Sequence, residues 1–199
     1  METLLLVRHA LAGSNRDAVA SSAVPGEGLT PEGVQQARAL AVELTEVDIA
    51  LAATTELART QETLRLALHG RDIPMVSVPE LNEIRFGSFD GGLLDTYRAW
   101  AAVQSPSERA PGGGESRADV AARFARGLRV LLALDGDTIL FVGHALALRY
   151  ALDAAEGLPP AALMRPVEHA RPYRIDRSGI ERAAGLLEAW SLAPQFRTA

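Results

Sequence analysis

The sequence contains neither cysteine nor lysine. The lack of cysteine excludes a disulfide framework, a thiol nucleophile and a cysteine-rich metal site. Because all 20 basic residues are arginines, a Schiff-base lysine and a P-loop lysine are excluded too. Basic charge is scarce overall, since 25 acidic residues leave a formal net charge of −5. That balance argues against nucleic acid as a partner, because phosphate backbones are bound by basic side chains.

Long hydrophobic runs are missing as well. No apolar stretch approaches the ~18 residues that a membrane span needs. The apolar segment near the amino terminus follows Glu2, is short and ends in charge, so it does not have the pattern of a signal peptide. With 199 residues and 48% hydrophobic content, the chain can bury one sizeable core. We therefore expect a single domain over residues 1–199 in the cytoplasm, without membrane contact.

Short apolar runs alternate with helical repeats along the chain. The apolar runs predict strands at Leu4–Val7, Asp48–Ala52, Met75–Val78 and Thr138–Val142. Start signals and apolar spacing predict helices from Pro31, from about Arg59, over 93–103, from Glu115 and over 145–156. Signals after Pro159 are weaker and predict a helical turn and edge strands. This alternation predicts an α/β fold, a three-layer α/β/α sandwich with a mainly parallel central sheet, whose strand order the sequence does not give.

Polar side chains follow the predicted strands at their carboxyl ends. Arg8 and His9 come directly after the first strand, Arg59 lies in the first turn of the helix after the second, Glu83 follows the third and His144 the fourth. The carboxyl ends of parallel strands share one edge of a sheet, where open α/β sheets bind ligands. We therefore expect two arginines, two histidines and one carboxylate to converge there.

These residue types suit phosphoryl transfer. Arginine binds phosphate oxygens bidentately, and helix amino termini add backbone donors. A neutral histidine can attack phosphorus and form a phosphohistidine, which divides one slow hydrolysis into two easier transfers. A carboxylate can protonate the leaving oxygen and later deprotonate water, a role worth roughly 10²–10⁴-fold. A zinc site from His9 and His144 is disfavoured, because the arginines would repel the ion and no third ligand has metal spacing.

The motifs resemble those of the histidine phosphatase superfamily, also called phosphoglycerate mutase-like. Arg8-His9-Ala10 resembles the family's Arg-His-Gly, with the glycine replaced. Further similar blocks follow in the family's order, at Leu29–Ala37, Thr54–Thr63, Leu81–Gly91, Pro111–Ser116 and Val142–Ala145. The resemblance covers about residues 4 to 150 and implies the family's fold.

The resemblance also implies roles for individual residues. It makes His9 the phosphorylated nucleophile and Glu83 the proton donor and general base. The transferring phosphoryl group would be held by Arg8, Asn15, Arg59 and His144. No metal and no cofactor are implied, and the partner is a small phosphorylated substrate. The expected activity is that of the phosphatase branch, a metal-independent phosphatase that forms a phosphohistidine.

Three residues depart from the family pattern and leave alternatives open. Ala10 would put a methyl group beside the nucleophile, and Leu11-Ala12 would make the pocket wall more apolar. One alternative is a phosphoglycerate mutase-type phosphotransferase, disfavoured by the length and by the missing lysine. The other is a weakly catalytic protein that only binds a phosphorylated ligand. Substrate selectivity is expected in loops 15–28 and 99–114, and the substrate itself is not given by the sequence.

Other features predict structural roles. Arg117, Arg123, Arg126 and Arg129 repeat along one side of a predicted helix and indicate a solvated face. His69 and His169 lie outside the motifs, and no functional role is expected for them. The glycines of 111–114 predict a surface loop that could act as a lid. Edge strands near the carboxyl terminus could pair two copies into a homodimer.

Overall fold

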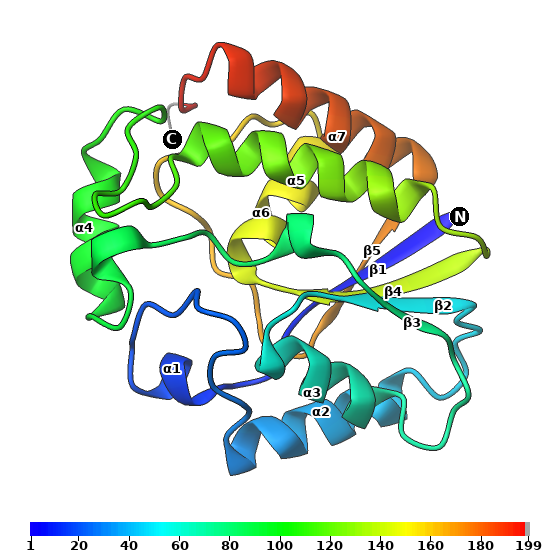
Figure 1. Ribbon diagram of the computed structural model, residues 1–199. Coiled ribbons are helices and arrows are strands. Elements are labelled where there is room, and N and C mark those ends of the chain that lie inside the picture. Colours follow the sequence, from blue (N-terminus) through cyan, green and yellow to red (C-terminus); the bar gives the residue numbers. More distant parts are fainter. Residues whose placement is uncertain (198–199) are drawn as a thin grey trace.

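A computed structural model describes residues 1–197 and contains a five-stranded sheet with strand order β3-β2-β4-β1-β5 (Figure 1). The strands are β1 (Thr3–Arg8), β2 (Leu51–Thr54), β3 (Met75–Ser77), β4 (Thr138–Gly143) and β5 (Pro172–Asp176). All adjacent pairs are parallel except β1 and β5, which are antiparallel. The predicted mainly parallel sheet is confirmed.

Helices cover both faces of this sheet. Because successive side chains of a strand point to opposite faces, β1 sends Leu4 and Leu6 to one face and Leu5 and Val7 to the other. The first face packs against α5 (Arg117–Leu132), α6 (Ala145–Ala155) and α7 (Arg177–Leu192). The second packs against α2 (Pro31–Glu43) and α3 (Ala58–Ala67), on the opposite side in Figure 1. The predicted three-layer sandwich is confirmed.

The burial of the strands explains why some of them were easier to predict from the sequence than others. β1 and β4 lie inside the sheet and are covered on both faces, which is why both are continuous apolar runs. β2 begins at Leu51, three residues after the predicted start. β3 was predicted to be buried, but it is a short edge strand in which Met75 is 53% exposed. An edge strand has only one neighbour, so its apolar residues can remain at the surface.

The carboxyl-terminal part differs most from the prediction. It contributes one edge strand, β5, and then the 16-residue helix α7. Asp176 caps α7 by accepting a hydrogen bond from the Gly179 amide. Buried Ile180 and Leu187 belong to the core between α7 and its neighbours α5 and α6. This packed helix replaces the helical turn that the sequence suggested.

Short elements occupy the connections on the ligand side of the sheet. They are α1 (Gly13–Arg16), η1 (Pro79–Leu81), η2 (Gly87–Phe89) and α4 (Leu94–Ala102). The sequence predicted no element between residues 13 and 28, so α1 is a correction, while α4 falls inside the predicted stretch 93–103. No helix in residues 1–197 is both long and apolar enough to cross a membrane.

Candidate active site

Two adjacent inner strands, β1 and β4, bring two histidines together. β1 and β4 pair with Arg8 beside Gly143, so the next residue of each chain segment, His9 and His144, leaves the sheet at the same edge. The His9 amide donates to the Gly143 carbonyl at 2.9 Å, and the ring centroids of His9 and His144 lie 5.4 Å apart. The juxtaposition is thus fixed by strand register.

His9 is oriented and uncharged as a nucleophile requires. Its Nδ1 lies 2.8 Å from the Ala10 carbonyl oxygen, which can only accept, so we assign the ring proton to Nδ1. Nε2 then carries the lone pair and accepts a hydrogen bond from Arg59 Nε at 3.2 Å. Burial, followed by the charges of Arg59 and Arg8, holds the pKa of His9 well below its usual range. His9 is therefore neutral at pH 7.

His144 is completely buried between the same arginine and a buried threonine. Its Nε2 lies 3.0 Å from Thr55 Oγ1, and its Nδ1 lies 3.4 Å from Arg59 Nη2 and 3.9 Å from Glu83 Oε2. Burial, and then the positive charge of Arg59, lowers the pKa of His144 far below normal. This ring can therefore serve as a neutral hydrogen-bonding group beside His9.

Two buried arginines supply positive charge and unused donors. Arg8 Nη1 donates to the Val167 carbonyl at 2.8 Å, and Arg59 Nη2 donates to the Ser21 carbonyl at 3.0 Å. Arg8 Nε and Arg59 Nη1 are buried and have no hydrogen-bond partner within residues 1–197. Burial lowers the pKa of Arg8 to about 10, so the side chain stays charged at pH 7. Buried donors without partners cost about 1–3 kcal/mol each, which favours a ligand with acceptor oxygens.

Glu83 and Asn15 are the two remaining site residues predicted from the sequence. Glu83 Oε1 accepts from the Ile84 amide at 3.0 Å, and its side chain is 15% exposed. Asn15 lies on α1, where its Oδ1 accepts from the Ala12 amide at 3.3 Å. Both residues line one cavity of about 450 Å³ together with Arg8, His9 and Arg59. The structure therefore brings all six predicted residues to one place, with His144 beside Arg59.

Apart from Phe86, which lies in the block Leu81–Gly91, the outer wall of the cavity comes from segments that carried no motif. Phe86, Leu94 and Tyr97 line it on one side, and Leu163 and Met164 on the other. Tyr97 is buried, which raises its pKa to about 12. The helical stretch that contains Leu94 and Tyr97 was predicted, but no sequence signal indicated that residues 162–167 return to the site. The outer wall is consequently apolar and aromatic in large part, although Arg98, Arg117 and Arg165 line it too.

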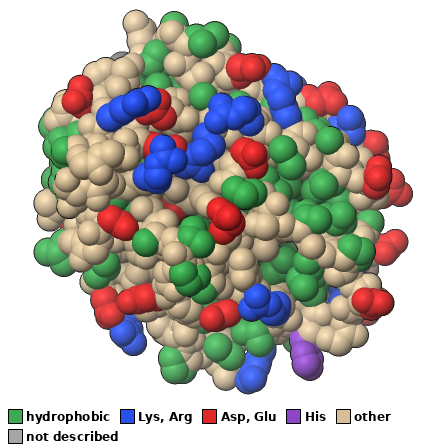
Figure 2. Space-filling view, viewed as in Figure 1, with side chains coloured by type: hydrophobic (Ala, Val, Ile, Leu, Met, Phe, Trp, Pro, Cys, Tyr) green, Lys and Arg blue, Asp and Glu red, His purple; other side chains and the backbone are tan. Residues whose placement is uncertain are grey.

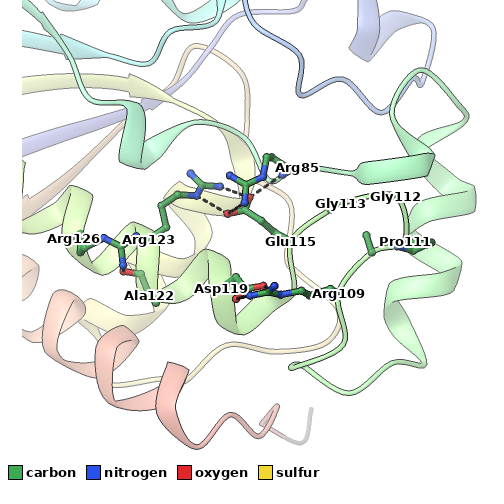
Figure 3. A pocket seen from close by; sticks show the side chains of 12 residues that line it. Arg85, Arg109, Pro111, Gly112, Gly113, Glu115, Asp119, Ala122, Arg123 and Arg126 are labelled. Atoms are coloured by element: carbon green, nitrogen blue, oxygen red, sulfur yellow. Dashed lines mark hydrogen bonds and ion pairs between the residues drawn. The ribbon is translucent and has the colours of Figure 1, made fainter.

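Two sequence-based interpretations of the pocket wall are wrong. Ala10 is fully buried and its amide donates to Thr63 Oγ1 at 3.0 Å; among the described residues, the cavity lining includes neither Ala10 nor Leu11-Ala12. The loop 111–114 lines a different groove, of about 600 Å³, with Arg85 and Arg109 (Figure 3). It does not form a lid in this structure.

The structure places His169 beside the site and corrects the predicted solvated face of arginines. His169 Nδ1 lies 2.6 Å from the His9 carbonyl, and its ring centroid is 5.5 Å from that of His9. Burial, and then Arg8, lowers the pKa of His169 to about 4. Arg117 is 9% exposed and its Nε donates to Tyr150 Oη at 2.7 Å, while Arg123 pairs with Glu115. Neither arginine belongs to a solvated face, although Arg126 and Arg129 are exposed as predicted.

Fold and site together define a class of protein. A mainly parallel sheet presents two neutral histidines and two buried arginines at its carboxyl edge, which is the arrangement of a phosphoryl-transfer enzyme. The family model described as the histidine phosphatase superfamily (branch 1) matches residues 4–189, and the chain belongs to this superfamily. The predicted family, fold class and enzyme class are thereby confirmed.

Comparison with individual proteins shows which members of the superfamily this chain resembles. The chain is 31% identical to the adenosylcobalamin/alpha-ribazole phosphatase of Escherichia coli (strain K12), over 87% of this chain and 85% of that protein. It is 30% identical to the 2,3-bisphosphoglycerate-dependent phosphoglycerate mutase 2 of Gloeobacter violaceus, over 77% and 70%. The alpha-ribazole phosphatase structure from Shigella flexneri superposes with a TM-score of 0.73 at 28% identity, covering 87% of this chain and 90% of that one.

Proposed function

We propose that this protein is a metal-independent phosphatase that hydrolyses a small phosphomonoester through a phosphohistidine at His9. One observation carries the proposal above all: His9 Nε2 accepts from Arg59 and His9 lines one cavity with Arg59 and Arg8, each of which has a buried N–H without a partner in residues 1–197. Nucleophile and oxyanion donors thus share one buried spot. Charge compensation by arginine replaces the metal that other phosphoryl-transfer enzymes use.

The reaction proceeds in two transfers. His9 Nε2 attacks phosphorus, the P–N bond forms, and the bond to the leaving oxygen breaks as Glu83 donates a proton to that oxygen. The ionised Glu83 then takes a proton from water, whose oxygen attacks phosphorus and releases phosphate and free His9. Arg8, Arg59 and the ring of His144 bind the non-transferring oxygens in both steps.

The apolar outer wall favours a phosphomonoester with a bulky, weakly polar group. Phe86, Tyr97 and Met164 offer apolar surface for a ring system, beside the arginines that also line the cavity. Because the relatives include phosphatases named for alpha-ribazole, alpha-ribazole phosphate is the first substrate to test. A phosphoglycerate mutase activity is the second candidate, favoured by the similarity to the Gloeobacter mutase. A protein that only binds phosphate is disfavoured, because Ala10 does not reach the cavity.

The test combines phosphoenzyme trapping with turnover. Wild-type protein in excess EDTA should release phosphate from para-nitrophenyl phosphate and, after quenching in base, yield a phosphoenzyme that is lost on treatment with acid. His9→Ala should abolish both signals, whereas His69→Ala, which removes an exposed histidine outside the site, should keep both. Turnover by His9→Ala would refute the assignment. Isomerisation of phosphoglycerate faster than phosphate release would favour the mutase.

Three further predictions about the whole protein stay open. Residues 1–199 are expected to act as a single domain, located in the cytoplasm. Pairing of two copies remains a prediction that sedimentation or light scattering can test. None of them alters the chemistry proposed for the site.

A further inference from the structure

The proton donor of the proposed reaction has the least local support of the site residues. His9 and His144 directly follow strands that are paired in register. Glu83 instead lies on an irregular segment between η1, which ends at Leu81, and η2, which starts at Gly87. No strand ladder holds this segment. Something else must fix the Glu83 carboxylate within reach of the leaving oxygen, because general acid catalysis depends on that distance.

We propose that the buried ion pair between Glu115 and Arg123 positions Glu83 for catalysis. The proposal rests on the proposed function, since it assumes that Glu83 is the proton donor. Neither side chain lines the catalytic cavity, so both act through the backbone of residues 80–85 and are positioning residues. Figure 3 shows Arg123 and Arg85 directed at Glu115, which lies at the start of α5.

Arg123 connects the carboxylate of Glu115 to the segment that carries Glu83. Its Nε and Nη2 donate to Glu115 Oε1 and Oε2 at 2.8 and 2.7 Å, a bidentate pair. Its Nη1 donates to the carbonyls of Glu80 and Asn82 at 3.0 and 2.8 Å, and Nη2 also donates to the Glu83 carbonyl at 3.2 Å. One planar guanidinium thus binds three carbonyls of the segment and one carboxylate.

Glu115 holds the same segment from its other end. Its Oε2 accepts from the Arg85 amide at 2.9 Å, and its own amide donates to the Arg85 carbonyl at 2.9 Å. Residues on both sides of Glu83 are therefore tied to Arg123 on α5 or to Glu115 just before it. The adjoining loop packs on the segment too, because Pro111 accepts from the Ser88 amide at 2.7 Å. Gly87, the residue before Ser88, has φ +60°. A Cβ at this position would lie 2.1 Å from the Pro111 carbonyl oxygen.

The pair is charged and shielded from water. Glu115 is 3% exposed and Arg123 is 12% exposed at the side chain. Burial by itself raises the pKa of Glu115, but hydrogen bonds from Arg123 and the Arg85 amide outweigh it and bring the pKa below the usual range. A buried ion pair contributes little net stability compared with apolar residues of the same volume. The geometry of the ion pair therefore says more about its role than its contribution to stability does. A lysine in place of Arg123 lacks the planar fork and could not reproduce this geometry.

The arginines gathered over α5 in Figure 2 provide a matched control. Arg109 forms an equally short bidentate pair with Asp119 on the same helix, at 2.7 and 2.8 Å. Arg109 donates no hydrogen bond to residues 80–85 within the described chain, and its side chain is 71% exposed. A variant at Arg109 removes one arginine pair of α5 without touching the support of Glu83.

The experiment uses the dependence on the leaving group. Loss of a proton donor slows the release of a poor leaving group, such as the alkoxide of glycerol phosphate, far more than the release of para-nitrophenolate, which leaves without a proton. We expect Glu83→Gln to lower kcat/KM about 100-fold for glycerol phosphate and less than about 5-fold for para-nitrophenyl phosphate. Arg123→Gln should show the same selectivity, with a loss of about 10-fold for the alkyl ester and little for the aryl ester.

Further variants complete the design. Arg109→Gln should match the wild type on both esters. The double variant of Glu83→Gln and Arg123→Gln should be no more selective than Glu83→Gln alone, because the pair acts only through that carboxylate. If Arg123→Gln does not fold, Arg123→Lys and Glu115→Gln take its place with the same expected pattern.

Three results would overturn the inference. Equal losses on both esters in the Arg123 and Glu115 variants, or no loss at all, would show that the ion pair is a purely structural contact. An additional selective loss in the double variant would show that Arg123 acts independently of Glu83. If Glu83→Gln itself fails to discriminate between the esters, the proposed role of Glu83 falls, and the positioning role falls with it.

Discussion

Acid should destabilise this protein in a pH range where its carboxylates are still ionised. The pKa values of His9, His144 and His169 all lie below the normal value, because burial and neighbouring arginines oppose the charged ring. In the unfolded chain the same rings titrate near pH 6.5. The unfolded state therefore binds more protons below pH 6.5, and stability that is present above this pH is lost as the pH falls.

The magnitude follows from linkage. A histidine that stays neutral in the folded state lowers the free energy of unfolding by about 1.4 kcal/mol per pH unit once the unfolded ring is protonated. Between pH 7.5 and 5.0 this amounts to about 2 kcal/mol each for His9 and His144. We allow about 1 kcal/mol for His169, which is only partly buried and is screened by solvent. The expected loss of about 5 kcal/mol is as large as the whole stability of many domains.

Urea unfolding, followed by tryptophan fluorescence at both pH values, measures this loss. His169→Gln should reduce the difference between the two pH values by about 1 kcal/mol, since one titrating ring is removed. His69→Gln, at an exposed position outside the cluster, should leave the difference as in the wild type. A wild-type difference below about 2 kcal/mol would refute the reasoning, because at least two of the rings would then be protonated in the folded protein.

Three further changes test the site and the core. Arg59→Met should weaken vanadate binding at least about 100-fold in calorimetry, because hydrogen bonds to charged groups contribute about 1.5–3 kcal/mol each. An unchanged affinity for vanadate would contradict the proposed phosphate-binding role of Arg59. Thr55→Val removes the hydrogen-bond partner of His144 Nε2 and should lower kcat/KM about 10-fold. A variant with the kcat/KM of the wild type would disprove this prediction. Leu187→Ala should lower the free energy of unfolding by about 2–5 kcal/mol in urea, since Leu187 is fully buried, while KM stays unchanged.

The part of the site that follows strands could be predicted from sequence. Buried parallel strands are continuous apolar runs, so the ends of β1 and β4 were evident, and with them Arg8, His9 and His144. Arg59 was found because its helix follows β2 directly. Their meeting point follows from a general property of parallel sheets, and needs no knowledge of the strand order.

The remainder depends on contacts between distant segments. The position of His169 arises because Ala170 donates to the Arg8 carbonyl, a contact that no local pattern encodes. Arg123 and Arg126 have the same residue type and neighbouring positions, yet only Arg123 meets a buried carboxylate. Helix α7 did leave a signal, with Asp176 as cap and Ile180 and Leu187 at helical spacing. Its core face otherwise contains Trp190 and three small residues, Gly179, Ala183 and Ala184, and these small residues weaken the contrast between apolar and polar sides.

The register of β1 against β4 separates two properties that can change independently. His9 and His144 are locked to neighbouring strands in the centre of the sheet, and their spacing cannot change unless the sheet itself breaks. The apolar wall around Tyr97 and Met164 belongs to α4 and to the connection after α6, both at the periphery. Mutation, insertion or exchange of these peripheral segments can therefore alter which ligands the cavity accepts while the two histidines stay in place. A scaffold of this kind is suited to diversification by loop grafting, both in evolution and in the laboratory.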